Sequence, residues 1–333
     1  MTKLCLGLVR ELKRDFPWNE SPLPRDADSE LLSTDEEREL IEGLESAGYD
    51  VGVVGDAGDL VGNLAAWKDR CDLVFNKSVG YTGVDRKLVA AAVLEAAGIP
   101  YTGSAPGSLA LTRNKHHAKL IVQSTAIATP ASVLMSERRE VDRLKALEYP
   151  VIVKPVAESS SIGIGAQSVV DHPDGAGELA LELIKLYRQP AVVESFVPGY
   201  DIEVPLVADP ELRPLDVIAF KHNGQYVCGD LLLTSELVYD DDYELAPAPD
   251  DVDVERVKEA AVRAATVLEV RDYGRIDFRL AADGTPFFIE ASTHPHIQRH
   301  SGFCVACRWR GLHYADMLRM IVSAAARRYG LIT

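Results

Sequence analysis

Two carboxylates within residues 274–292 would share a cation if this segment forms a hairpin. Asp283-Gly284 separates two runs of alternating apolar and polar residues, which is typical of a two-residue hairpin turn. With this turn, Asp277 lies directly opposite Glu290 on the neighbouring strand. Carboxylates in such a pair are about 5 Å apart at Cβ and repel each other unless a positive charge balances them. The hairpin therefore predicts a cation at this pair.

The cation is either a bound metal or an arginine of the same strand. Alternation places Arg275, Asp277 and Arg279 on one face of the strand and the apolar residues between them on the other. Mg²⁺ takes one or two carboxylates and completes its shell with water and substrate phosphates. Arg275 or Arg279 would instead neutralise the carboxylates in a ladder of ion pairs. The hairpin alone leaves both interpretations open.

A candidate phosphate-binding loop lies earlier in the chain. Residues 151–154 form an apolar run that ends in Lys154, and a loop rich in serine and glycine follows at residues 158–165. Backbone N–H groups and hydroxyls of such a loop can surround phosphate oxygens, and a lysine adds a point charge. The pattern is not that of a P-loop, because the lysine precedes the loop. Strand, lysine and loop together predict a phosphate site, which favours Mg²⁺ between Asp277 and Glu290.

A third group of chemically active residues lies near the C-terminus. Cys304 and Cys307 have the spacing of zinc ligands, and His296 and His300 would complete a set of four. A single pair of cysteines at this spacing is a weak signal for zinc. The family resemblance described below implies instead that the segment from His294 to Cys307 lines a substrate pocket.

The composition excludes several classes of protein. The 333 residues include 35 Lys and Arg against 51 Asp and Glu, a formal net charge of −16. General binding to nucleic acids or anionic membranes needs a basic surface, so neither partner is expected. The apolar stretch 4–9 is too short to span a membrane and lacks a signal-peptide pattern, and five scattered cysteines are not a disulfide framework. We expect a cytoplasmic protein of about two domains or a few packed subdomains.

Three successive sets of elements must position these residues. Strands and helices alternate over the first hundred residues, which predicts a parallel sheet with helices on its faces. A compact α+β unit follows, and the last third combines strands, an irregular acidic stretch at 238–251, a helix and the hairpin. The expected strands are 3–9, 51–54, 72–76, 131–135, 151–154, 166–170, 191–196, 202–208 and 215–220. The expected helices are 34–47, 57–68, 84–97, 107–124, 138–147, 175–187, 253–268 and 314–328.

From about residue 99 to 303 the chain resembles the ATP-grasp ligases, and among them those similar to D-alanine–D-alanine ligase. The matching segments are 101–104 leading to Lys115, 153–155 with 158–163, 193–194 with 199–203, 274–277, and 290–293 followed by His300-Ser301. The resemblance implies an α/β chain with the ATP-grasp fold. It implies an N-terminal doubly wound parallel-sheet domain (1–107), a central α+β lid subdomain (108–193) and a C-terminal α+β domain with the metal site (194–333).

The resemblance also implies roles for individual residues. Lys115 and Lys154 would contact the ATP phosphates, and Ser160 and Ser161 would close over them as a mobile lid. Glu194 and the backbone near Val197 would hold the adenine, and Asp201 would reach the ribose. One or two Mg²⁺ ions would be held at Asp277, Glu290 and Ser292. The catalytic residues would be Arg275 and Lys154 at the reacting phosphoryl group, and Ser301 near the substrate carboxylate.

The chain departs from the family where the substrates bind. Ser292 replaces an asparagine metal ligand, and His294-Pro295-His296 replaces small residues that help to form an oxyanion hole. Residues 76–80 and 10–11 do not reproduce the family's elements for D-alanine. We therefore expect a substrate pair other than two D-alanines. The residues that we expect to face substrate are Glu11, Lys77, His296 and Ser301.

The implied activity is an ATP-dependent carboxylate–amine ligase that forms an amide or peptide bond through an acyl phosphate. Its substrates would be small amino acids or carboxylic acids, and the resemblance also implies a homodimer. A kinase or an intramolecular cyclase would share the first step and remains an alternative. A nucleotide sensor without turnover is a non-enzyme alternative, and the retention of Lys154, Asp277 and Glu290 argues against it.

Overall fold

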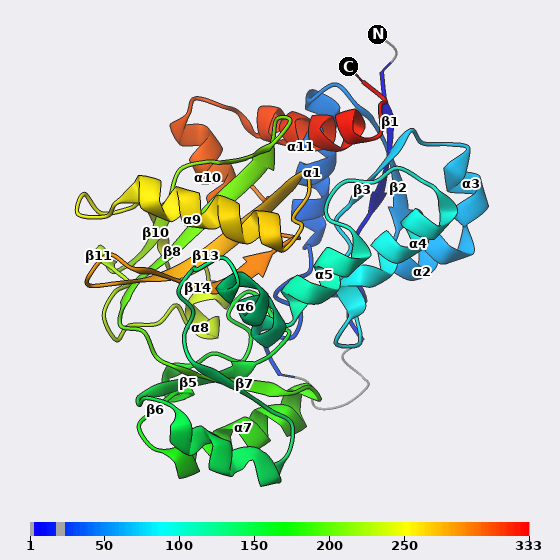
Figure 1. Ribbon diagram of the computed structural model, residues 1–333. Helices are drawn as coiled ribbons and strands as arrows, with labels where there is room; N and C mark the ends of the chain where they lie inside the picture. Colours follow the sequence, from blue (N-terminus) through cyan, green and yellow to red (C-terminus); the bar gives the residue numbers. More distant parts are fainter. Residues whose placement is uncertain (1–2, 18–23, 333) are drawn as a thin grey trace.

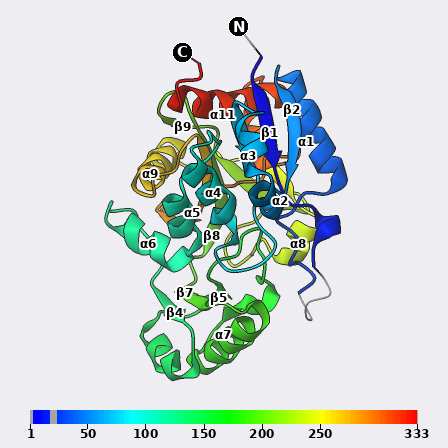
Figure 2. The same cartoon turned by 90° about the vertical axis from the view of Figure 1, so that its right-hand side faces the viewer.

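The computed structural model describes residues 3–17 and 24–332 of the chain. Over these residues, three sheets follow one another along the sequence, and helices pack against each of them (Figure 1). The N-terminal and C-terminal sheets share one end of the molecule with helix α11 (Tyr314–Arg328), and the small central sheet lies at the other end (Figures 1 and 2). None of the described helices is long and apolar enough to cross a membrane.

The N-terminal sheet is parallel, as the alternating pattern predicts. Its strand order is β2 (Asp50–Gly55), β1 (Cys5–Val9) and β3 (Leu73–Asn76). Leu6 and Leu8 of β1 are buried on one face, and Val9 is buried on the other. The first face is covered by α1 (Thr34–Ser46) and α11, and the second by α2 (Ala57–Gly62), α3 (Leu64–Lys68) and α4 (Val89–Ala97). Helices on both faces confirm the doubly wound arrangement.

The central sheet is antiparallel and carries one long helix. Its order is β4 (Ser132–Met135), β7 (Ala191–Ser195), β5 (Val151–Pro155) and β6 (Val169–Val170), with α7 (Pro173–Tyr187) packed on one face. The predicted helix 138–147 is instead a 3₁₀ helix, Arg138–Ala146. Its apolar residues Val141, Leu144 and Leu147 recur every third position, which matches the three-residue turn of a 3₁₀ helix.

The C-terminal sheet is antiparallel and carries the hairpin. Its main order is β11 (Gln225–Tyr226), β10 (Ile218–His222), β8 (Gly199–Ala208), β13 (Tyr273–Ala281) and β14 (Pro286–Ser292), with β9 (Leu212–Pro214) beside β8 and β12 (Glu244–Pro247) beside β10. Ile276, Phe278 and Leu280 of β13 pack in a core with α9 (Val254–Val267). The opposite face of β13 carries Arg275, Asp277 and Arg279, as predicted.

Several predicted elements are interrupted or incomplete. The expected helix 107–124 is broken at Asn114 into α5 (Pro106–Arg113) and α6 (Lys115–Gln123), and the Asn114 side chain accepts a hydrogen bond from the His117 N–H (3.0 Å). This break places Lys115 at the first position of α6. The acidic stretch 238–251 is not wholly irregular, because it contains the end of α8 (Ser235–Tyr239) and β12. Helix α10 (Gly302–Trp309) was not predicted.

The expected domain boundaries at residues 107 and 193 remain predictions. The central sheet continues to Ser195, whose N–H donates to the Ala131 carbonyl. Helix α6 follows the first boundary in sequence, but its residues Ala118 and Val122 are buried in the core of the C-terminal sheet. Helix α6, which the expected boundaries assign to the central subdomain, therefore packs against the C-terminal sheet.

Candidate active site

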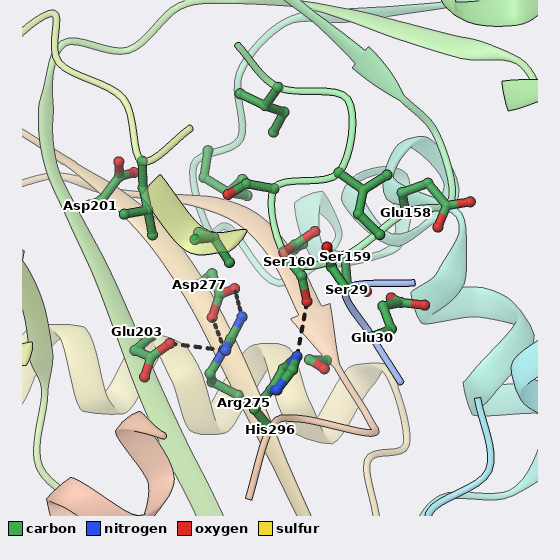
Figure 3. Close-up of a pocket in the computed structure, with 18 of the residues that line it drawn as sticks. Ser29, Glu30, Glu158, Ser159, Ser160, Asp201, Glu203, Arg275, Asp277 and His296 are labelled. Atoms are coloured by element: carbon green, nitrogen blue, oxygen red, sulfur yellow. Dashed lines mark hydrogen bonds and ion pairs between the residues drawn. The ribbon is translucent and has the colours of Figure 1, made fainter. Parts of the chain in front are cut away.

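Residues from all three sheets line one cavity of about 470 Å³. Lys77 follows β3 of the N-terminal sheet, Lys154 and Glu194 belong to the central sheet, and the C-terminal sheet contributes the charged face of β13. The loop 158–162 also lines the cavity, and Figure 3 shows it above the charged residues of the C-terminal sheet. The cavity therefore brings together most of the residues that the sequence singles out.

The hairpin pairs Asp277 with Glu290, but through a different turn from the one predicted. Near the turn, Ala281 N–H donates to the Thr285 carbonyl (3.0 Å), which encloses three residues rather than two, and Gly284 has a φ of 77°. A three-residue loop with glycine in the left-handed conformation is a common hairpin connection. An irregularity after Asp277 then shifts the register by one residue and restores the predicted pair. The pairing was right, and the two-residue turn was wrong.

Arg275 lies between two carboxylates on this face (Figure 3). It forms two hydrogen bonds with Asp277, both 2.7 Å, and an ion pair with Glu203 at 3.0 Å. Burial raises the pKa of Asp277 to about 7 against the opposing effect of Arg275. Glu290 pairs instead with Lys115 (2.8 Å), which holds its pKa at about 2 although burial works in the opposite direction. The structure therefore contains the ion pair with an arginine that was one of the two alternatives for the hairpin, because Arg275 neutralises part of the carboxylate cluster.

The same donors fit Mg²⁺. Asp277 and Glu290 supply two carboxylates, and Glu203 is paired with Arg275. All three acids line the cavity, and carboxylate oxygens are the ligands that Mg²⁺ prefers. Ser292, which is 9% exposed, also lines the cavity two residues after Glu290 on the same face of β14. The donor set is therefore suited to a hard divalent cation that is shared with substrate phosphates.

Two buried lysines share Glu194. Lys154 lies 2.9 Å and Lys119 lies 2.7 Å from its carboxylate oxygens, and all three side chains are almost fully buried. Burial would raise the pKa of Glu194, but the two lysines lower it to about 2. Glu194 and Lys154 line the cavity, whereas Lys119 is not among the lining residues. The carboxylate therefore holds Lys154 in place at the cavity wall and leaves one excess positive charge there.

Arg279 holds together the part of the cavity wall that contains Asp201 and Val197. It pairs with Asp201 at 2.9 Å and donates to the carbonyls of Val197 (3.0 Å) and Gly229 (2.7 Å). Its guanidinium also lies 4.9 Å from the centre of the Phe196 ring. Asp201 and Val197 both line the cavity, so Arg279 positions the two residues expected near the ribose and adenine.

The serine-rich loop contacts the rest of the cavity. Ser160 and Ser161 both have a φ of 54°, the left-handed conformation that residues other than glycine rarely adopt. The Ser160 hydroxyl lies 2.9 Å from Nε2 of His296 (Figure 3). Glu158 pairs with Arg86 (2.8 Å) and Arg113 (3.2 Å), which tie the start of the loop to the N-terminal part of the chain. The loop is therefore closed over the cavity.

Replacing Glu30 with glutamine is expected to destabilise this closed arrangement. Glu30 is 5% exposed and pairs with Lys87 (2.6 Å), Arg86 (2.8 Å) and Arg113 (3.4 Å). Breaking a buried ion-pair network by removing one partner costs about 3–5 kcal/mol, because the remaining charges stay buried. Urea unfolding would measure this loss, with the exposed Asp142→Asn as a control. An unchanged free energy of unfolding for Glu30→Gln would show that the network does not stabilise the fold.

The expected substrate-facing residues have different positions. Lys77, His296 and Ser301 line the cavity, and the Ser301 side chain also caps α10 by accepting from the Cys304 N–H (3.3 Å). Glu11 is not among the lining residues. It is 1% exposed and accepts hydrogen bonds from the Ser78 hydroxyl (2.8 Å) and from a neighbouring backbone N–H. The position of Glu11 therefore does not support its predicted contact with substrate.

The segment with zinc-like spacing is divided between the cavity and the core. His294, His296 and His300 line the cavity, whereas Cys304 and Cys307 are buried in the apolar core around α11. Within residues 3–17 and 24–332, no group of three or more His, Cys, Asp or Glu side chains is placed to hold a metal ion. The prediction that the whole segment lines a pocket is correct for the histidines and wrong for the cysteines.

Sequence reasoning missed several residues of the site. Glu203, Glu30 and Lys87 line the cavity but were not selected. Glu203 lies two residues after Asp201 on β8 and directly opposite Asp277 on β13. The two-residue alternation of acids at 201 and 203 was the available signal, because it places both side chains on the same face of a strand. Glu30 lies in a turn, and Lys87 lies in a 3₁₀ helix, Arg86–Leu88, that precedes α4 within the expected helix 84–97.

The central sheet and the C-terminal sheet line a cavity in which buried lysines pair with carboxylates, as Lys115 does with Glu290 and Lys154 with Glu194. Residues 121–323 match the family described as D-ala D-ala ligase C-terminus. The chain belongs to the D-alanine–D-alanine ligase family and is an ATP-dependent ligase that forms C–N bonds.

Individual relatives agree with this assignment. The chain is 32% identical over 289 residues to a D-alanine–D-alanine ligase of Cupriavidus taiwanensis, covering 85% of this chain and 82% of the relative. It is 31% identical over 261 residues to an uncharacterised protein of Sinorhizobium fredii, covering 77% and 75% of the two chains. A D-alanine–D-alanine ligase structure from Bacillus anthracis, complexed with ATP, aligns with a TM-score of 0.71 at 21% identity over 97% and 98% of the chains. The structural likeness supports the ATP-grasp fold.

Proposed function

We propose that the protein joins a small carboxylic or amino acid to an amine by way of an acyl phosphate, using ATP and Mg²⁺. The observation that carries this proposal is the cavity itself, where Arg275 pairs with Asp277, Lys115 pairs with Glu290, and Lys154 is held at the wall by Glu194. A carboxylate is a poor electrophile, and both ATP and the acid are negatively charged. Their reaction therefore needs a site that concentrates cations at the transferring phosphoryl group.

The reaction proceeds in two displacements. An oxygen of the substrate carboxylate attacks the γ-phosphorus of ATP and releases ADP, which gives an acyl phosphate. The amine nitrogen then attacks the acyl carbon, loses a proton and releases phosphate, which leaves the amide. Arg275 and Lys154 stabilise the negative charge that develops during both steps, because they are fixed by Asp277 and Glu194 before substrate binds.

ATP is held by residues of the central and C-terminal sheets. We assign its phosphates to Lys115 and Lys154 and its ribose to Asp201. The buried Glu194 and the backbone of Val197 would lie beside the adenine, where Arg279 fixes Val197 through its carbonyl. Ser160 and Ser161 close over the phosphates, and this closure excludes water from the acyl phosphate.

Mg²⁺ would be held by Asp277 and Glu290, with Ser292 as a weaker or water-mediated partner. When bound, the metal neutralises phosphate charge and orients the phosphoryl group for in-line transfer. Arg275 donates to both oxygens of Asp277, so a bound metal would share this carboxylate with the arginine. A neutral serine at 292 offers less charge than an acid, which favours firm binding of one ion over two.

The binding of Mg²⁺ is expected to weaken as the pH falls below about 7. The pKa of Asp277 is raised to about 7, so its protonated form, which is a poor metal ligand, predominates below that value. Affinity for Mg²⁺ should then fall by about tenfold per pH unit. The stability of the metal-free fold should change in the opposite direction, because it declines as the pH rises from about 4 to about 7 and Asp277 loses its proton. Calorimetric titration of Mg²⁺ with a non-hydrolysable ATP analogue would measure this. In the Asp277→Asn variant, the pH dependence of Mg²⁺ affinity that comes from this carboxyl group must disappear. The pH dependence that comes from protonation of the nucleotide must remain.

The substrate pair is proposed to differ from two molecules of D-alanine. His296 enters the cavity and contacts the lid through Ser160, and Lys77 enters from the end of β3. Both side chains occupy space in the cavity and add polarity to it. This supports a substrate with more polar groups than alanine.

Phosphate release from Mg²⁺-ATP, measured with the pure protein against single and paired amino and carboxylic acids, tests the proposed function. Each active mixture is then analysed by mass spectrometry. Release that requires a pair, with a product lighter by one water than the two substrates combined, supports the ligase. A phosphorylated or dehydrated single substrate would establish a kinase or a cyclase instead. ATP binding without phosphate release from any mixture would contradict the proposed activity.

A further inference from the structure

Lys77 differs from the other buried lysines because it has no carboxylate partner. It is 3% exposed, and its Nζ donates to the carbonyl of Pro295 at 3.3 Å. Elsewhere in residues 3–17 and 24–332, every buried lysine lies 2.6–2.9 Å from a carboxylate oxygen; these are Lys87, Lys115, Lys119 and Lys154. A buried ammonium loses its hydration, and without a counter-charge this loss is not compensated. The position therefore has an excess positive charge.

The nearby acids are engaged elsewhere. Glu11 accepts hydrogen bonds from Ser78 and the Val79 N–H, Glu30 pairs with Lys87, and Glu36 accepts from the Ser33 N–H at the start of α1. None of them forms an ion pair with Lys77 among the described residues. Their negative charges act on Lys77 only through space, and burial outweighs them, so that the pKa of Lys77 falls to about 8. Lys77 still carries its charge at pH 7.

Two histidines, His294 and His296, flank the Pro295 carbonyl that Lys77 contacts. His294 is 4% exposed, lines the cavity, and neither of its ring nitrogens has a hydrogen-bond partner within the protein. An imidazole carries at least one N–H donor in either of its protonation states. An ammonium without a carboxylate partner thus lies near an imidazole whose buried nitrogens have no partner, a combination that fits a carboxylate.

Building on the ligase activity proposed above, we propose that Lys77 and His294 bind a second acidic group of the substrate, one that is not joined in the reaction. The family resemblance already assigns one free carboxylate to Ser301, at the start of α10 in the C-terminal part of the chain. Lys77 approaches the cavity from the N-terminal sheet instead. The substrate class is therefore an acidic amino acid or a related dicarboxylate.

Replacing Lys77 with methionine separates substrate binding from a role in the fold. Methionine fills a similar volume without charge, so the substrate-free variant should unfold at the same temperature as the wild type or a higher one. Lys119→Met is the matched control, because Lys119 is equally buried but pairs with Glu194, and its loss should lower the unfolding temperature. The probes are aspartate and glutamate, as both enantiomers, and alanine, each with Mg²⁺ and ADP.

Wild-type protein should bind at least one acidic amino acid, and Lys77→Met should weaken this binding by about 10–100-fold, the value of a charge-assisted hydrogen bond. The KM for ATP should change little.

If Lys77→Met unfolds at a lower temperature, as Lys119→Met should, or if no acidic probe binds, the inference is wrong. Turnover of alanine pairs with equal rates in wild type and Lys77→Met would overturn the inference and leave the ligase intact. Lys77-dependent binding of an acidic probe without turnover of any pair would instead retain the inference and contradict the proposed function.

Discussion

Asp277→Asn is expected to lower Mg²⁺-ATP-dependent phosphate release by about 10²–10³-fold, the usual cost of losing one preorganised charge at a reacting group. Asparagine keeps the shape of the side chain and can still accept a hydrogen bond from Arg275. It loses the negative charge that we assign to Mg²⁺. The concentration of Mg²⁺ for half-maximal activity should therefore rise together with the fall in rate. Phosphate release over a Mg²⁺ titration measures both quantities.

Glu203→Gln is the matched control for this experiment. Glu203 lies directly opposite Asp277 on β8 and forms a comparable ion pair with Arg275 (3.0 Å). If Asp277 acts only by holding Arg275, the two variants should shift the Mg²⁺ requirement equally. If Asp277 holds the metal, Asp277→Asn should shift it much further. An Asp277→Asn enzyme with unchanged rate and Mg²⁺ dependence would refute the metal assignment.

The hairpin illustrates how far sequence reasoning reaches. Period-two alternation correctly placed Arg275, Asp277 and Arg279 on one face, because one side of the strand must pack in the core. The turn was wrong by one residue, and the irregularity near Phe278 corrected the register before the charged pair. Local turn preferences do not determine where a strand absorbs an extra residue, since this depends on how both strands pack.

The contacts between distant segments were beyond the reach of the sequence. Lys87 and Arg113 converge on Glu30, although more than fifty residues separate each of them from it. No period or spacing connects these positions, because the closed loop and the N-terminal segment meet only in the folded chain. In contrast, Lys154 was found from its place at the end of an apolar strand, where the side chain must leave the core.

Lys154→Met is expected to reduce phosphate release about 10²-fold more than Lys119→Met does. The two lysines are alike in burial and both pair with Glu194, at 2.9 and 2.7 Å, but only Lys154 is among the residues lining the cavity. Each substitution leaves Glu194 with one lysine, so the structural cost is similar in both. The difference between the variants therefore isolates the contact of Lys154 with the phosphates.

The same comparison distinguishes binding of ATP from catalysis. A lysine that contacts ATP equally before and during phosphoryl transfer changes the KM alone, whereas a lysine whose contact strengthens in the transition state lowers kcat. Because Glu194 fixes Lys154 before ATP arrives, we expect most of the loss in kcat. Equal kcat and KM values for the two methionine variants would show that Lys154 acts only through Glu194, and the phosphate site would then have to lie elsewhere in the cavity.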